Sequence, residues 1–151
     1  MCRINKYELV CEKVEGYNVD FIDKRIRDSS DIARFIIEVL KADKYTTERF
    51  MEFMLDTKLR IIGYCEVSRG NLDSSPVHPR EVFQPAIATP KCAAIIVAHN
   101  HPSGDPTPSS DDILISKRLM GASDIIGIKL LDHVIVGDHC FTSMKSEGFM
   151  E

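Results

Sequence analysis

Two histidines, a serine and an aspartate are concentrated in one short segment of the chain, between His99 and Asp112. His99 and His101 directly follow the apolar stretch 93–98, whose composition predicts a buried strand. Side chains two residues apart on a strand point to the same side of a sheet, so these two imidazoles can share a metal ion. Asp112 can supply a third ligand and leave one position open to water, which is the arrangement of a catalytic zinc site rather than a closed structural one.

Ser109 and Asp112 also have a structural interpretation. Ser-x-x-Asp directly before the apolar run 113–115 is the pattern of a helix capping box, in which each side chain caps a backbone N–H of the other residue. By itself the pair favours capping, whereas two histidines at strand spacing in front of it favour metal binding. The two interpretations are compatible, because a capped helix start is a stable platform for a metal ligand.

The spacing of these four residues resembles the JAMM signature of the JAB/MPN metalloprotease superfamily, which reads His-x-His, seven residues, Ser, two residues, Asp. The His-Pro-Ser-Gly sequence at 101–104 resembles the RadC-like branch in particular, as do the segments 66–75, 77–83 and 131–138. The resemblance covers residues 30–149. It implies an α+β fold in which helices flank a mixed sheet, in the three-layer arrangement of JAB/MPN and cytidine-deaminase-like domains.

This resemblance implies a zinc-dependent hydrolase that cleaves peptide or isopeptide bonds with a metal-activated water. The site that it implies has His99, His101 and Asp112 as Zn²⁺ ligands, Glu66 as the general acid/base, and Ser109 as the hydrogen-bond donor to the oxyanion. The substrate is expected to be a peptide or a protein, and no residue pattern identifies which one.

Glu66 receives its role from the pattern Glu66-x-x-x-Gly70, which resembles the upstream glutamate motif of the family. A single carboxylate at a strand end is more often a solvated surface group. Glu81 is the nearest alternative, but it lies in the first turn of a predicted helix, where it suits the helix dipole. Asp105 and Asp111 are acidic neighbours of the histidines, and the family spacing selects neither of them.

The remaining histidines and the cysteines suggest no second site. His78, His133 and His139 do not stand at ligand spacing to the first two histidines, and we expect structural or surface roles for them. The five cysteines are widely spaced and include no Cys-x-x-Cys, so neither a zinc ribbon nor a redox pair is expected.

The composition of the 151 residues bounds the class of protein. We expect one domain over 1–151, with 1–29 as an N-terminal extension of a core at 30–149. The sequence has no apolar run of about 18 residues and no signal-peptide core, so we expect no membrane span and a cytoplasmic location. The formal net charge of −4 and the pI of about 5.7 argue against a protein held on DNA mainly by phosphate contacts.

A non-catalytic DNA-repair or mobile-element accessory protein of the RadC family is the alternative function. Longer members of that family resemble a fusion with an N-terminal helix-hairpin-helix module, and residues 1–29 contain no Gly-rich hairpin of that kind. We therefore expect no nucleic-acid partner for this chain alone. A zinc nucleobase deaminase would need His-x-Glu and Pro-Cys-x-x-Cys, and neither occurs. The letters His-Asn-His at 99–101 do not reproduce the dispersed ligands of an HNH nuclease.

Periodicity and turn residues predict the elements that must position these side chains. From the N-terminus they are a weak edge strand 7–14, a helix 30–44, a hairpin of strands 50–55 and 59–68, a loop 71–75, a helix 79–88 that starts at Pro79 and contains Pro85, a strand 91–98, a rigid loop 102–108, a helix 111–120 capped by Gly121, strands 125–131 and 133–136, and a last short strand 140–143.

Overall fold

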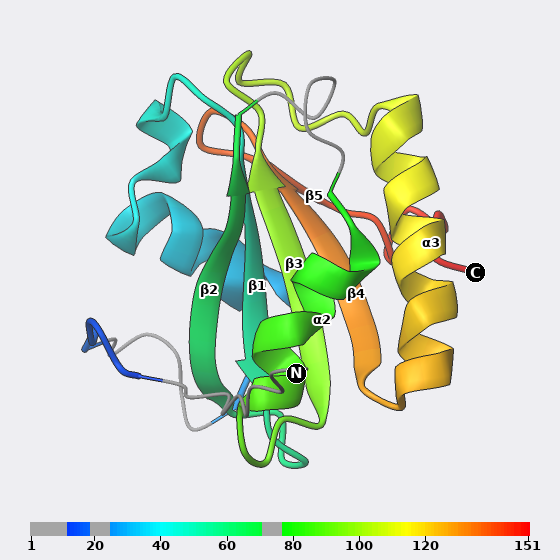
Figure 1. Ribbon diagram of the computed structural model, residues 1–151. Coiled ribbons are helices and arrows are strands. Elements are labelled where there is room, and N and C mark those ends of the chain that lie inside the picture. Colours follow the sequence, from blue (N-terminus) through cyan, green and yellow to red (C-terminus); the bar gives the residue numbers. More distant parts are fainter. Residues whose placement is uncertain (1–11, 19–24, 71–76) are drawn as a thin grey trace, which may run out of the picture.

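The computed structural model describes residues 12–18, 25–70 and 77–151, and Figure 1 shows the order of its elements. The helices are α1 (Ser29–Arg34), α2 (Pro79–Ala88) and α3 (Ser110–Ile126), with a π-helical turn, η1 (Phe35–Val39), directly after α1 and a 3-10 turn, η2 (Ala42–Lys44). The strands are β1 (Arg49–Leu55), β2 (Ile61–Arg69), β3 (Ala94–Asn100), β4 (Lys129–Val136) and β5 (Phe141–Ser143). No helix in the described ranges combines the length and the apolar character that a membrane crossing requires.

The strands form one mixed sheet in the order β2-β1-β3-β4-β5. β1 runs antiparallel to β2 and β3, whereas β3 and β4 are parallel and β5 is antiparallel to β4. Parallel neighbours need a crossover connection, and α3 provides it between β3 and β4. The end of β3, the start of α3 and the start of β1 therefore meet at one edge of the sheet, the upper edge in Figure 1.

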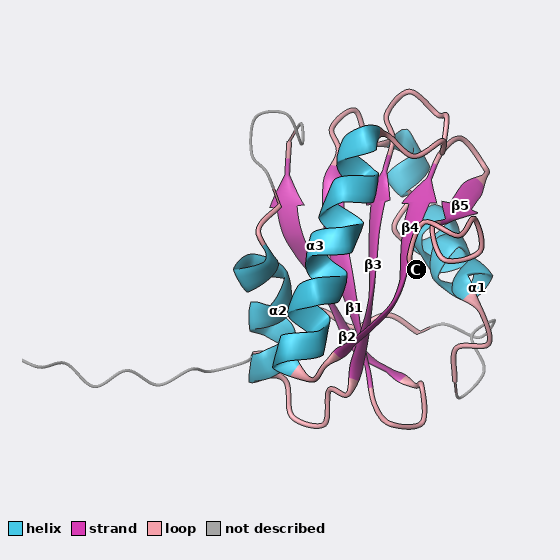
Figure 2. Ribbon diagram, turned by 90° about the vertical axis from the view of Figure 1, so that its right-hand side faces the viewer, coloured by secondary structure: helices cyan, strands magenta, loops and turns pink. Residues whose placement is uncertain are grey.

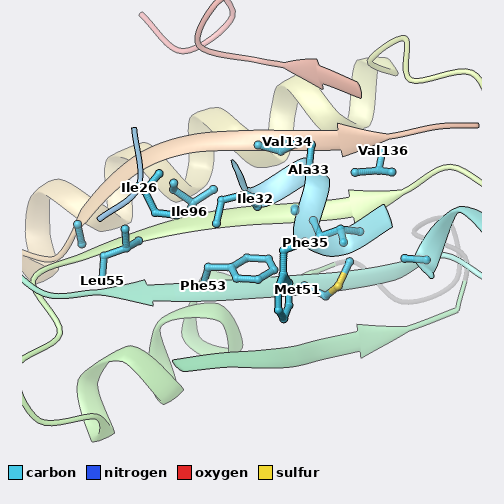
Figure 3. Close-up of a cluster of buried hydrophobic side chains, with 14 residues drawn as sticks. Ile26, Ile32, Ala33, Phe35, Met51, Phe53, Leu55, Ile96, Val134 and Val136 are labelled. Carbon is cyan, nitrogen blue, oxygen red and sulfur yellow. The ribbon is translucent and has the colours of Figure 1, made fainter. Parts of the chain in front are cut away.

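Helices cover both faces of this sheet, so the fold has three layers (Figure 2). On one face, α1 and η1 pack on β1, β3 and β4 around Phe53, as Figure 3 shows. On the other face, α2 and α3 contribute Val82, Phe83 and Leu119 to a second cluster that includes Phe50. These observations confirm the predicted α+β class, with a mixed sheet between flanking helices.

The structure confirms the β1–β2 hairpin, and it confirms a helix α2 with Pro79 in its first turn and Pro85 inside it. The helix predicted over 30–44 is wrong in its second half. The chain is α-helical only in α1, widens into η1, and changes direction where Lys41 adopts the left-handed conformation (φ 55°). That change places Ala42 in the core, which is a consequence of tertiary packing that helical spacing does not encode.

The helix predicted over 111–120 is too short, because residues beyond Gly121 still pack on the sheet. α3 continues to Ile126, and its C-cap is Gly127 (φ 79°) rather than Gly121. The strand predicted over 125–131 is therefore wrong in its first part, and β4 is one strand where two were predicted. The short last strand is confirmed as β5.

The strand that carries the histidines begins and ends later than the predicted range 91–98. Lys91 adopts a left-handed conformation (φ 68°) before the strand starts, and β3 includes the first histidine, with His101 directly after its end. The strand predicted at 7–14 lies mostly outside the described residues, and its described part is not a strand. The loop predicted at 71–75 lies outside them.

Glu52 is an exception to the apolar character of β1. Its neighbours at period two, Phe50 and Met54, face α2 and α3, so the Glu52 carboxylate lies on that side of the sheet. The side chain is fully buried, and neither carboxylate oxygen has a hydrogen-bond partner. Desolvation disfavours the charged form and raises the pKa of Glu52 to about 8.

Replacement of Glu52 by glutamine should change the pH dependence of stability. The folded state retains the proton up to about pH 8, whereas the unfolded chain releases it near the ordinary pKa of 4.5, so rising pH favours unfolding across this interval. The free energy of unfolding of Glu52→Gln, measured with urea, should gain on the wild type by up to about 1.4 kcal/mol per pH unit there. Parallel pH profiles for the two proteins would contradict a buried, protonated Glu52.

Candidate metal centre

Four side chains from three parts of the fold place ligand atoms within 4.8 Å of one another. They are Glu48 just before β1, His99 in β3, His101 directly after β3, and Asp112 in the first turn of α3. The pairing of β1 with β3 and the crossover through α3 bring these positions to the same edge of the sheet (Figure 1). His99 and Asp112 are fully buried, whereas Glu48 and His101 are each 16% exposed and so can be reached from solvent.

The distances among these atoms suit a small cation. His99 Nε2 lies 2.9 Å from His101 Nε2 and 3.1 Å from Asp112 Oδ1. The distance from His101 Nε2 to Asp112 Oδ2 is 3.4 Å, and that from His99 Nε2 to Glu48 Oε1 is 3.7 Å. Ligand atoms at about 2.0–2.1 Å from a tetrahedral Zn²⁺ stand about 3.3 Å apart, so two imidazoles and a carboxylate at these distances fit zinc.

Both histidines turn the same nitrogen toward the cluster. His101 Nδ1 lies 2.7 Å from the carbonyl oxygen of Asp105, and because a carbonyl can only accept, this nitrogen carries the proton. Nε2 of a neutral His101 then faces the cluster with its lone pair. His99 Nδ1 likewise points away from the cluster, toward His133 Nε2 at 2.8 Å.

The two carboxylate oxygens of Asp112 have different surroundings. Oδ2 accepts hydrogen bonds of 2.7 Å from both the N–H and the hydroxyl of Ser109. Oδ1 is buried, faces His99 Nε2 and has no hydrogen-bond partner. Desolvation raises the pKa of Asp112, but the imidazoles of His101 and His99 and the Ser109 hydroxyl outweigh it and hold the pKa well below its usual range. An ionised oxygen facing a ring nitrogen across 3.1 Å is what a shared cation would satisfy.

Ser109 has the capping role that its spacing indicates. It is the N-cap of α3, its hydroxyl accepts from the N–H of Asp112 at 3.1 Å, and the Asp112 carboxylate accepts from the N–H of Ser109. The capping box is therefore confirmed, and it is also what aims Asp112 at the histidines. The structure thus brings together four of the five predicted site residues.

The fifth, Glu66, is not part of the cluster. A register shift in the pairing of β1 with β2 places Glu66 opposite Met51, on the face that α1 covers, whereas His99 lies on the face of α2 and α3. The Glu66 carboxylate is 3.2 Å from Arg49 Nη1 and 2.7 Å from Arg69 Nε. Desolvation raises the pKa of Glu66, but these two guanidinium groups outweigh it and hold the pKa below its ordinary value.

Glu48 is a site residue that the sequence interpretation missed. Asn100, which stands between the two histidines, holds the segment around it: its Oδ1 accepts from Arg49 N at 2.9 Å, and its Nδ2 donates to the Thr47 carbonyl at 3.2 Å. These bonds attach the backbone on both sides of Glu48 to the end of β3. Glu48 lies far from the histidines in sequence and only strand pairing brings it near, so no spacing within one sequence indicates it.

His133, for which we expected a structural or surface role, lies directly behind the cluster. It is fully buried in β4, the parallel neighbour of β3, and its two ring nitrogens contact His99 and Ser116. Burial lowers the pKa of His133 well below its ordinary value, so the ring is neutral. The position of this histidine at the start of the apolar strand predicted at 133–136 was the available signal.

A second group of possible ligands in the described part of the chain consists of Asp43, Asp138 and His139. The last two side chains are exposed, and His139 Nε2 lies 3.6 Å from Asp138 Oδ1. Exposed groups of this composition commonly hold no ion. Three other carboxylates considered from the sequence contribute no ligand atom to either group: Glu81, Asp105 and Asp111.

Comparison with known proteins identifies the family of this domain. The family described as the RadC-like JAB domain matches residues 26–149. A UPF0758 protein of Desulforamulus reducens is 46% identical over 125 residues, which cover 83% of this chain and 54% of the relative. One from Geobacter sulfurreducens is 52% identical over 103 residues (68% and 44%), and one from Clostridium perfringens is 41% identical over 142 residues (93% and 61%).

The chain spans about half the length of the curated relatives it matches. The match to the family nevertheless covers the described sheet and helices from before α1 to beyond β5. On this basis the chain belongs to the RadC-like JAB domain family.

Proposed function

We propose that this domain is a zinc-dependent hydrolase of peptide or isopeptide bonds, in which His99, His101 and Asp112 hold the metal. The observation that carries the proposal is the buried Oδ1 of Asp112, which faces the Nε2 of His99 and has no hydrogen-bond partner. Two imidazole nitrogens and one carboxylate are the ligands of many catalytic zinc sites, and they leave a fourth position for water. Because the His101 side chain is 16% exposed, solvent water would be able to reach that position.

A zinc ion held there would lower the pKa of a water molecule toward 7 and polarise the scissile carbonyl. Glu48 is the carboxylate that we propose as the general base, because its Oε1 lies 3.7 Å from His99 Nε2 and its side chain is 16% exposed. It would take the proton of the attacking water and return it to the leaving amine. Glu66, which we expected in this role, faces the other side of the sheet and is paired with two arginines.

Ser109 can serve both the metal site and the reaction. Its N–H holds Asp112 Oδ2 whatever the position of the hydroxyl. Ser109 is an exposed residue at the start of α3, and its hydroxyl would be able to turn from Asp112 toward the oxyanion of a tetrahedral intermediate. Loss of one such donor typically lowers the rate by about 10²–10³.

The first test is the metal content of the protein. We expect one Zn²⁺ per chain by equilibrium dialysis and elemental analysis, and loss of most of it in His99→Ala/His101→Ala, because the ligand set loses both nitrogens. The matched control is His139→Ala, which removes a histidine from the exposed group and should retain the zinc. Full zinc content in the double variant, or its loss in His139→Ala alone, would place the metal elsewhere.

The second test separates the two candidate bases. Glu48→Gln and Glu66→Gln should both retain zinc, since neither removes one of the three proposed ligands. On a panel of peptide- and isopeptide-linked substrates, Glu48→Gln should lose about 10²-fold or more in turnover, a typical contribution of general base catalysis. Glu66→Gln should keep it. Loss of turnover in Glu66→Gln, with wild-type turnover in Glu48→Gln, would instead assign the general base to Glu66.

The third test concerns the alternative function, a DNA accessory protein. Nonspecific binding to duplex DNA typically has dissociation constants of about 10⁻⁴–10⁻⁶ M at physiological salt. With a net charge of −4, the domain should bind no more tightly than the weak end of this range. Fluorescence anisotropy with a labelled duplex measures this affinity. Submicromolar binding that weakens steeply with added salt would favour the accessory role over the hydrolase.

A further inference from the structure

A row of buried hydrogen bonds runs behind the metal cluster and joins the two buried ligands. His99 Nδ1 is 2.8 Å from His133 Nε2, and His133 Nδ1 is 2.6 Å from Ser116 Oγ. Ser116 Oγ in turn donates to the backbone carbonyl of Asp112 at 2.7 Å. With the contact of His99 Nε2 and Asp112 Oδ1 at 3.1 Å on the metal side, these bonds close a ring through β3, β4 and α3.

The chemistry of the last acceptor fixes the direction of every bond in the row. The carbonyl of Asp112 can only accept, so the hydroxyl proton of Ser116 is used there and Ser116 Oγ must accept from His133 Nδ1–H. A neutral His133 then has a bare Nε2, which accepts from His99 Nδ1–H. His99 is left with a bare Nε2, and this is the nitrogen that faces His101 and Asp112.

We infer that His133 and Ser116 are positioning residues that hold His99 in the tautomer and ring orientation needed for metal binding. The inference rests on the proposed zinc site and adds to it two residues that touch neither metal nor substrate. Ligand histidines usually donate their second N–H to a fixed acceptor, and loss of that acceptor typically costs 10–100-fold in metal affinity. Here the acceptor is itself a histidine, whose own tautomer a buried serine sets.

The packing around these rings leaves them no alternative partner among the contacts that the structure describes. Phe50 stacks on His99 with centroids 6.0 Å apart and meets His133 edge-on at 5.4 Å. His99 and His133 are both fully buried, and the phenyl ring of Phe50 offers no hydrogen-bonding group, so a lost hydrogen bond between these rings has no replacement from Phe50. Without Ser116 as acceptor, the proton of His133 can move from Nδ1 to Nε2. It then faces the N–H at Nδ1 of His99, and this conflict favours the His99 tautomer that carries its proton on Nε2, the nitrogen that faces the metal cluster.

The test compares two serines of the same helix. Ser116→Ala removes the acceptor of His133, whereas Ser123→Ala removes a buried hydroxyl that donates to the Ile128 carbonyl and accepts from Leu130 N, both at 2.9 Å. We expect a similar fall in Tm for both variants. Zinc affinity, measured by competition with a chromophoric chelator, should fall at least tenfold in Ser116→Ala and stay at the wild-type value in Ser123→Ala.

A second pair of variants addresses His133 itself. His133→Gln can still offer an acceptor oxygen near the position of Nε2, whereas His133→Phe keeps an aromatic ring against Phe50 but offers none. Zinc affinity should be lower in His133→Phe than in His133→Gln by about tenfold or more. If neither variant folds, ¹⁵N NMR of the zinc-loaded wild type gives the answer, since it should show Nδ1–H protons on both His99 and His133.

The outcomes separate this inference from the proposed function. A wild type that binds no zinc would contradict the metal site itself. A wild type that binds zinc, together with Ser116→Ala and Ser123→Ala of equal zinc affinity, would overturn the role of His133 and Ser116 alone. Protonation of His99 on Nε2, with Nδ1 bound to the metal, would do the same.

Discussion

The structure depends most on a carboxylate buried beside two imidazoles. A buried ionised group without partners costs several kcal/mol, so it persists only where its surroundings satisfy it. The capping box of α3 satisfies Oδ2 of Asp112, and Oδ1 is left facing His99 Nε2. A cation between these two atoms would complete the arrangement, and this is the reason for proposing a metal site rather than an ion pair.

Separate backbone contacts hold the chain segments that carry the side chains of the cluster. The loop between β3 and α3 is fixed to the end of β4, since His101 N donates to the Val136 carbonyl and Asp138 N to the Gly104 carbonyl, each at 2.8 Å. This approach needs a glycine at 137, where a Cβ would lie 2.2 Å from Gly104 O. Strand pairing and the Asn100 side chain hold the opposite side of the cluster, so backbone contacts and one buried amide fix the segments that carry its side chains.

Local sequence signals predicted the parts of the site that lie close together in the chain. The His-x-His spacing on a strand and the Ser-x-x-Asp helix start predicted His99, His101, Ser109 and Asp112, and the structure brings these four together. Glu66 was assigned by motif resemblance, and a register shift that no local pattern reveals puts it on the other face. Contacts that depend on which strands are neighbours could not be predicted from local sequence patterns. The extension of α3 past Gly121 could not be predicted either, because packing on the sheet outweighs the local helix-stop signal.

X-ray absorption spectroscopy at the zinc edge of the zinc-loaded protein tests the central claim most directly, because it reports the ligands of the metal without reference to any substrate. The account predicts four light-atom ligands at about 2.0–2.1 Å, with the multiple-scattering signature of two imidazoles. A sulfur ligand at about 2.3 Å, or a shell without imidazole, would contradict it.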